Sequence, residues 1–213
     1  MSNQPNKKRS PKVRPTRGVD ACLFAAAKTG ALAQARSLVR RGANVEASNR
    51  KRETPLHCAA RSGNLALVRY FIQMGADLAA QTFKGASVLR FATQSKNRKL
   101  VRWLLEEKGA TFASADDLKG GLFGAIGKGD YRMARLLVEQ GADVRSLGWQ
   151  SQTTLHVAAR SGALPAVVWL VEQEGLALDV ADDQGKTPLD LAATAEIAEY
   201  LRLRFAGELD SPL

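Results

Sequence analysis

The chain has 213 residues, of which 45% are hydrophobic and 24% are charged, and its net charge is +10. This composition permits a folded core and excludes a membrane-spanning protein, because no stretch approaches the roughly 18 consecutive apolar residues that a spanning helix needs. Two cysteines and two histidines are too few for a disulfide scaffold, a His-rich metal site or most His-based catalytic arrangements. We therefore expect a non-enzymatic, intracellular, cytoplasmic protein without cofactor, metal or small-molecule substrate, in which Cys22 and Cys58 are reduced core thiols.

Residues 1–19, MSNQPNKKRSPKVRPTRGV, contain six basic residues, three prolines and no acidic residue. Such a segment cannot form a core, so we predict a disordered basic arm. KKRSPKVRPTR is similar to a nuclear localisation signal with a Ser-Pro phosphorylation site at Ser10, which would give a nuclear location in a eukaryotic cell. The other interpretations are an electrostatic tether and an unstructured leader. The arm residues expected to contact a phosphate or an acidic surface are Lys7, Lys8, Arg9, Lys12 and Arg14.

The positive charge is concentrated in the N-terminal half of the chain. Residues 1–111 contain 22 basic and 6 acidic residues, a net charge of +16, whereas residues 112–213 contain 9 and 15, a net charge of −6. Because a one-sided field steers oppositely charged molecules, we expect the partner to have an acidic surface.

From residue 20 onwards the sequence repeats with a period of about 33 residues, which is typical of proteins built from stacked repeats. The best-preserved copies are TPLHCAARSGN at 54–64 and TTLHVAARSGA at 153–163, and weaker copies start at residues 21, 87, 120 and 187. Each copy has a leucine and, three residues later, an alanine, which is the spacing of one helix face. A second amphipathic segment then follows and ends in glycine, which favours the left-handed residue that closes a helix. The pattern predicts repeated helix pairs.

These segments resemble the ankyrin repeat, whose 33-residue pattern contains T-P-L-H-x-A. The resemblance covers about residues 20–207 and implies an all-α solenoid of stacked helix-turn-helix units with projecting hairpin-like loops. We expect a monomer with six repeats, of which the first and last act as caps, followed by a C-terminal tail at 208–213. The expected repeats span about 20–46, 47–79, 80–113, 114–145, 146–180 and 181–207.

Repeats three and four depart most from the ankyrin pattern. Lys96 stands where the family has a turn glycine, and Gly120 and Gly121 stand where it has Thr-Pro. A lysine in a left-handed turn costs roughly 1 kcal/mol relative to glycine, and the loss of a threonine cap costs about as much. We therefore expect the middle of the array to be its least stable part. The sixth repeat lacks the residues between its two helices.

Two further motifs indicate structure rather than catalysis. The segment GGLFGAIGKGD at 120–130 is not a phosphate-binding loop, because Leu122 and Gly129 stand where that motif needs a glycine and a Ser or Thr. His57 and His156 occupy the same position in their repeats, and the resemblance implies that each imidazole hydrogen-bonds loop backbone. We therefore predict no catalytic residue and no metal ligand.

The resemblance implies that partners bind to the concave face, which consists of the loop tips and the exposed side of the first helices. The candidate residues are Arg50, Lys51, Arg61, Phe83, Lys84, Gln94, Lys128, Trp149, Gln150 and Arg160. Further loop tips are expected at Glu53, Asp116, Asp117, Asp183 and Gln184. An exposed aromatic ring at a loop tip has no role in folding and favours a binding function, whereas a ring that folds back on its neighbour does not. The sequence leaves both alternatives open for Phe83 and Trp149.

A second surface is the arginine ladder, a basic position that recurs once per repeat in the second helices. Its members are Arg36, Arg69, Arg102 and Arg135. The ladder is either a solvated surface or an electrostatic strip for phosphates or an acidic protein. We expect Trp103 and Trp169 to pack in the core, so that no aromatic side chains interleave with the ladder.

These observations predict a protein-protein interaction module or adaptor that binds its partner through the concave face and the loop tips. The alternative is a nucleic-acid-associated or ribonucleoprotein component, in which the basic arm and the arginine ladder contact phosphates. Salt dependence separates the two, because binding through roughly six or more phosphates weakens steeply as salt rises, whereas an interface built on apolar tips changes less.

Overall fold

The computed structural model describes residues 17–208, and the expected all-α solenoid is confirmed. Five helix pairs follow one another along the chain: α1 (Arg17–Thr29) and α2 (Leu32–Arg40), α3 (Pro55–Ser62) and α4 (Leu65–Gln73), α5 (Val88–Thr93) and α6 (Arg98–Glu106), α7 (Ala115–Gly127) and α8 (Tyr131–Glu139), α9 (Thr154–Ser161) and α10 (Leu164–Glu172). The described chain also contains the short 3-10 helix η1 (Trp149–Ser151) and ends with α11 (Ala195–Ala206).

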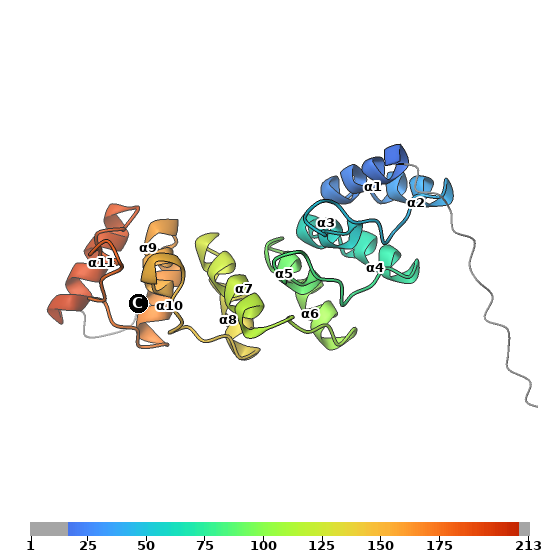
Figure 1. Cartoon of the computed structure of the whole chain (residues 1–213). Coiled ribbons are helices and arrows are strands. Elements are labelled where there is room, and N and C mark those ends of the chain that lie inside the picture. Colours follow the sequence, from blue (N-terminus) through green and yellow to red (C-terminus); the bar gives the residue numbers. More distant parts are fainter. Residues whose placement is uncertain (1–16, 209–213) are drawn as a thin grey trace, which may run out of the picture.

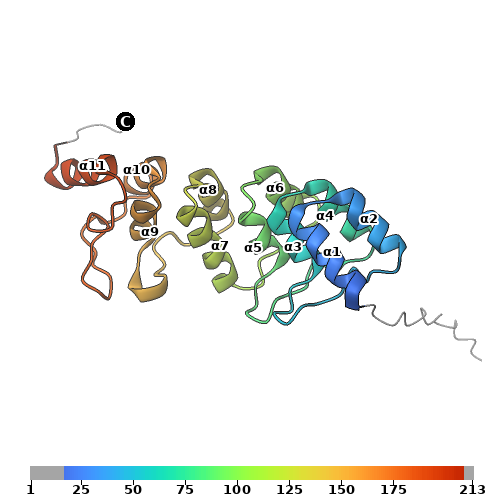
Figure 2. The same ribbon diagram turned by 90° about the horizontal axis from the view of Figure 1, so that it is seen from above.

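The helix pairs stack side by side into an elongated, curved array (Figure 1). The first helices of the pairs lie along the inner side of the arc and the second helices along its outer side. Consecutive first helices contact one another from α1 to α9, and the connecting loops project from one side of the stack (Figure 2). Each pair therefore packs mainly against its neighbours, which is the property that defines a solenoid.

Local capping determines where the best-preserved helices begin. The Thr54 hydroxyl accepts a hydrogen bond from the backbone N–H of His57, and Nδ1 of that histidine accepts one from the Thr54 N–H at 3.1 Å. Thr153 and His156 form the same reciprocal pair in α9. Because each pair satisfies two free backbone donors of the first turn, the threonine defines the helix start.

The repeated leucine and alanine positions form a continuous core between the helix pairs. The buried members are Leu23, Leu56, Leu89, Leu122 and Leu155 with Ala26, Ala59, Ala92, Ala125 and Ala158. In the sixth copy, however, Leu189 and Ala192 are only partly buried. Residues 188–191 of this copy form a turn rather than a helix, so α11 closes the described stack without a complete first helix below it.

Two expectations for the N-terminal end need correction. Helix α1 begins at Arg17, so the expected boundary between arm and repeats at residue 19 lies inside a helix. Cys58 is buried, and burial raises the pKa of its thiol. Cys22, in contrast, is exposed, because α1 is the first helix of the described stack and has a neighbouring repeat on one side only. Residues 1–16, with the candidate basic residues of the arm, and most of the tail lie outside the described residues.

Helix α7 begins at Ala115, six residues before Gly121, where the repeat register predicts its start. Ser114 caps it by accepting a hydrogen bond from the Asp117 backbone N–H, so the expected loss of a cap in repeat four is wrong. The expectation of projecting tips at Asp116 and Asp117 is also wrong, because both lie in the first turn of α7. Asp117 is buried and its carboxylate accepts hydrogen bonds from the backbone N–H groups of Ser87 and Ala113.

Lys96 has a left-handed backbone with φ of 59°, where Gly63, Gly129 and Gly162 close the corresponding turns of other repeats with φ between 68° and 76°. A side chain with a Cβ is strained in this conformation. We therefore expect Lys96→Gly to raise the free energy of unfolding by about 0.5–1 kcal/mol. Thermal and urea denaturation check this result, and an unchanged or lower stability would contradict it.

Candidate binding surface

Four hairpin-like loops project beside the first helices, and a backbone hydrogen bond closes each of them. The donor and acceptor pairs are Asn49 N–H to Glu53 O at 3.0 Å, Thr82 to Ala86 at 3.0 Å, Gly148 to Gln152 at 2.8 Å and Asp182 to Lys186 at 2.8 Å. Adjacent loops are also joined to each other. The Phe83 N–H donates to the Lys51 carbonyl at 2.8 Å, and the Asp183 N–H donates to the Gln150 carbonyl at 3.1 Å.

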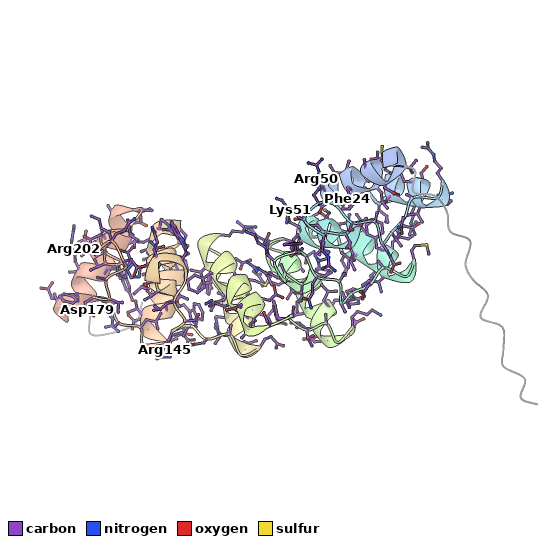
Figure 3. The ribbon with its side chains drawn as sticks, in the orientation of Figure 1. Phe24, Arg50, Lys51, Arg145, Asp179 and Arg202 are labelled. Atoms are coloured by element: carbon purple, nitrogen blue, oxygen red, sulfur yellow. The ribbon has the colours of Figure 1, made fainter. Side chains whose placement is uncertain are left out.

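The aromatic rings at two of these tips are exposed. Phe83 is 80% exposed and Trp149 is 81% exposed, so neither ring folds back on a neighbouring repeat. Lys84 is also exposed, and Figure 3 shows Arg50 and Lys51 on the inner side of the arc. The tips therefore combine large apolar rings with basic side chains.

A groove of about 430 Å³ lies between the first two of these loops, which belong to repeats two and three, and α5. Five of the predicted residues line it: Arg50, Lys51, Phe83, Lys84 and Gln94. The prediction missed Arg90 and Phe91 on α5, which also line the groove. The repeat register places both inside a first helix, and only the contacts between repeats show that they border the groove.

Arg61 and Arg160 occupy equivalent positions but have different partners. Nη2 of Arg61 lies 3.2 Å from Oε1 of Glu53, and the guanidinium stacks 4.3 Å above the Phe91 ring. Glu53 is buried rather than projecting, and although burial opposes the shift, hydrogen bonding by Asn49 and the charge of Arg61 lower its pKa. The positive charge of Arg61 is thus compensated within the fold.

Arg160 has no such compensation, because its Nη1 donates at 2.9 Å to the neutral amide oxygen of Gln152. It lines a second groove of about 770 Å³ between α7 and α9. The other residues around this groove are Arg90, Asp116, Lys119, Gly120, Phe123, Gly124, Gly127, Gly148, Trp149, Gln152 and Val157. Arg90 borders both grooves, so the two form one continuous surface along the concave face.

A family model that describes ankyrin repeats in three copies matches residues 23–116 and again residues 122–207. The chain belongs to the ankyrin-repeat family. No curated protein shows a significant sequence match to it. Ankyrin repeats are typically non-enzymatic modules for protein-protein interaction.

Solved structures of ankyrin domains share the fold. The ankyrin repeat domain of Bcl-3, a member of the IkappaB family, is 28% identical with a TM-score of 0.57, and the match covers 84% of this chain and 81% of that one. The human ASB11 ankyrin domain is 26% identical with a TM-score of 0.52, covering 85% and 96%. A chain from the complex of the endopeptidase Bd0816 of Bdellovibrio bacteriovorus with the immunity protein Bd3460 is 23% identical with a TM-score of 0.65, covering 85% and 96%.

The two ankyrin histidines differ in the partner of their Nε2 atom. Nε2 of His156 lies 2.9 Å from the Lys186 carbonyl in the following loop. Nε2 of His57 is buried without a hydrogen-bond partner in the described part of the chain, so the expected bond to the following loop forms only at His156. Burial lowers the pKa of His57, and the carbonyl of Ala86, at the position equivalent to Lys186, acts in the opposite direction. Within residues 17–208, no group of three or more His, Cys, Asp and Glu is arranged to hold a metal ion, and no helix is long and apolar enough to cross a membrane.

The arginine ladder lies on the second helices of the ankyrin pairs, and its four members are exposed. Two of them stack on an aromatic ring of the next repeat: Arg36 lies 5.4 Å from the Tyr70 ring centre, and Arg69 lies 4.9 Å from that of Trp103. The expectation that no aromatics interleave with the ladder is therefore wrong. Trp103 itself is buried as predicted. These stacking contacts give part of the ladder a role within the solenoid.

Gln94 and Lys128 lie at the ends of adjacent first helices and contact each other. Nζ of Lys128 donates to the Gln94 carbonyl at 2.5 Å. Burial, followed by the nearby charges of Lys96 and Arg61, lowers the pKa of Lys128. The structure thus places the Lys128 side chain against the backbone of Gln94, the neighbouring concave position that the sequence predicts.

Proposed function

We propose that this chain is a non-enzymatic adaptor that binds an acidic polypeptide on its concave face. The observation that carries this proposal is the exposure of Phe83 and Trp149, each beside a groove with basic side chains. Exposed aromatic rings gain from burial in an interface, and aromatic and arginine side chains are the most enriched among binding hot spots. Folding of the solenoid alone gives no reason for two rings at loop tips.

The charge of the two grooves favours an acidic partner. Together they are lined by six basic residues and two acidic residues. The basic residues are Arg50, Lys51, Lys84, Arg90, Lys119 and Arg160, and the acidic residues are Glu53 and Asp116. Complementary charge accelerates association and selects among partners. We place this activity in a cytoplasmic monomer.

The nucleic-acid-associated role is the weaker candidate. It uses the arginine ladder, but Arg36 and Arg69 have stacking contacts within the solenoid that account for their position. The exposed rings lie on the loops instead, away from the second helices that carry the ladder.

A double variant, Phe83→Ala with Trp149→Ala, tests the proposal. We expect it to weaken binding of a partner captured by the wild-type protein by at least about 30-fold, because hot-spot truncation typically costs 2 kcal/mol or more. The affinity is measured by titration calorimetry at low and moderate salt, and circular dichroism confirms folding.

The matched control is Arg69→Glu with Arg102→Glu on the outer face, which should leave the affinity unchanged. Loss of binding in this control, with retention in the aromatic variant, would favour the ladder and the nucleic-acid role.

A further inference from the structure

The row of projecting loops is interrupted at repeat four. The loops of repeats two and three are joined by the Phe83 to Lys51 hydrogen bond, and those of repeats five and six by the Asp183 to Gln150 bond. Between these two pairs, the chain enters α7 directly from the Ser114 cap. Figure 2 shows α7 between the two groups of loops. The gap exposes one side of α7 at the centre of the concave face.

The exposed side of α7 carries glycines that the fold does not need. A Cβ at Gly124 would meet nothing within 4 Å, and a Cβ at Gly127 would make only an ordinary contact of 3.5 Å with Val157. Gly124 lies inside α7, and Gly127 is its last helical residue. Because glycine in a helix interior is less stable than alanine, Gly124 weakens α7 without any gain inside the solenoid. The absence of side chains at the two glycines leaves room above the helix for another chain.

An aromatic wall borders this space. The Phe123 ring packs directly on Gly148, since a Cβ at that position would lie 2.6 Å from the ring. The next residue, Trp149, starts the helical turn η1, in which Gln150 and Ser151 both have a φ of 55°. Strained backbone of this kind persists where the surrounding structure holds it and is frequent at binding sites. The wall thus presents two rings, one half-buried and one exposed.

Positive charge lies along the same groove. Arg160 donates a hydrogen bond to the neutral side chain of Gln152. Nη1 of Arg90 lies 3.8 Å from Oδ1 of Asp117, but this carboxylate also accepts hydrogen bonds from two backbone N–H groups. Lys119 pairs at 3.6 Å with the exposed Asp116, a contact that water screens. A partner with carboxylates would complement this lining.

We propose that the groove between α7 and α9 is the docking site for an extended acidic segment of a partner protein. The segment places a large apolar side chain against Phe123 and Trp149, its backbone over Gly124, and carboxylates at Arg90 and Arg160. A volume of about 770 Å³ accommodates a few extended residues. This assignment rests on the proposed function and identifies the part of the concave face that selects the partner.

Trp149 provides the signal that tests the assignment. It is 81% exposed, whereas Trp103 and Trp169 are only 7% and 4% exposed, so a bound segment should mainly change the emission of Trp149. The probes are acidic hexapeptides with a central Phe, Leu or Ile, titrated into the full chain. We expect a saturable blue shift, which is absent with a central Ser and absent when the acidic residues are replaced by lysine. The lack of a saturable change with all three probes would overturn the assignment.

Gly124→Leu separates binding from folding. The new side chain enters open space and improves the helix, so the melting temperature should equal or exceed that of the wild type, while peptide affinity should fall at least about tenfold. Gly124→Ala should raise the melting temperature with a smaller loss of affinity. The matched control is Ala66→Leu, which adds the same surface at an exposed position of α4 and should bind normally.

These variants also distinguish the assignment of the α7–α9 groove from the proposed binding function of the concave face as a whole. If the captured partner is lost by the Phe83 and Trp149 double variant but Gly124→Leu binds both peptide and partner normally, this assignment is wrong and the concave-face function stands. If the double variant also binds the partner normally, the proposed function is wrong as well.

Discussion

Replacing Leu122 by alanine should lower the free energy of unfolding by about 3–5 kcal/mol, the largest effect that we expect from a single substitution. The side chain is fully buried at the centre of α7. This helix contacts α5 on one side and α9 on the other, as well as its own partner α8. Truncation removes the transfer energy of the buried methyl groups and leaves a cavity that rigid neighbouring helices cannot close.

The same substitution should change the cooperativity of unfolding. In a solenoid, stability is approximately the sum of the repeat stabilities and of the interfaces between neighbours, so a weak central repeat uncouples the two ends. Urea denaturation followed by circular dichroism should show two transitions for Leu122→Ala. Leu189→Ala, at a half-buried position of the last repeat, is the control. It should lower the free energy of unfolding by less and show no second transition. Equal losses for the two variants would mean that repeat four does not couple the halves.

Asp117→Ala should lower the free energy of unfolding by about 2–3 kcal/mol. The Asp117 carboxylate is 2% exposed and accepts hydrogen bonds from the Ser87 N–H at 3.3 Å and from the Ala113 N–H at 3.0 Å. Without it, the buried Ser87 N–H loses a charged acceptor, and the neighbouring guanidinium of Arg90 loses its carboxylate. A buried donor without a partner costs most of its desolvation energy.

Asp116→Ala is the matched control, because Asp116 is the preceding residue and its side chain is exposed. Thermal and chemical denaturation should show a change within about 0.5 kcal/mol for this control. Asp117→Asn, which retains one oxygen acceptor but no charge, should fall between the two. If both aspartates tolerate alanine equally, the buried carboxylate does not stabilise the contact between repeats three and four.

The residues that cap and close the helices could be recognised in the sequence because they act over a few positions. Thr54 and Thr153 bond to histidines three residues away, and the left-handed glycines close the helices that immediately precede them. The leucine and alanine pattern depends on helix geometry in the same way. These local relations are sufficient to predict the all-α solenoid and the ankyrin-repeat family from the sequence.

The early start of α7 departs from the repeat register, although Ser114 followed by Asp116 and Asp117 is a local signal for a helix start. The repeat register assigned this segment to a loop, whereas its acidic residues suit the first turn of a helix. The bond between Asp117 and Ser87 has no local signal, since the two residues are 30 positions apart along the chain.

The binding surface was determined mostly by contacts between repeats. The sequence identified Phe83, Trp149 and Arg160 as candidates, but it could not determine whether the rings are exposed, or that Arg61 is paired with Glu53 while Arg160 is not. It also could not show that Arg69 stacks on an aromatic ring of the next repeat. Periodicity specifies which residues are equivalent in each repeat. Whether these residues are exposed, form ion pairs or line a groove depends on the side chains that the neighbouring repeats place beside them. Those neighbours are separated by a whole repeat along the chain and meet only in the folded stack.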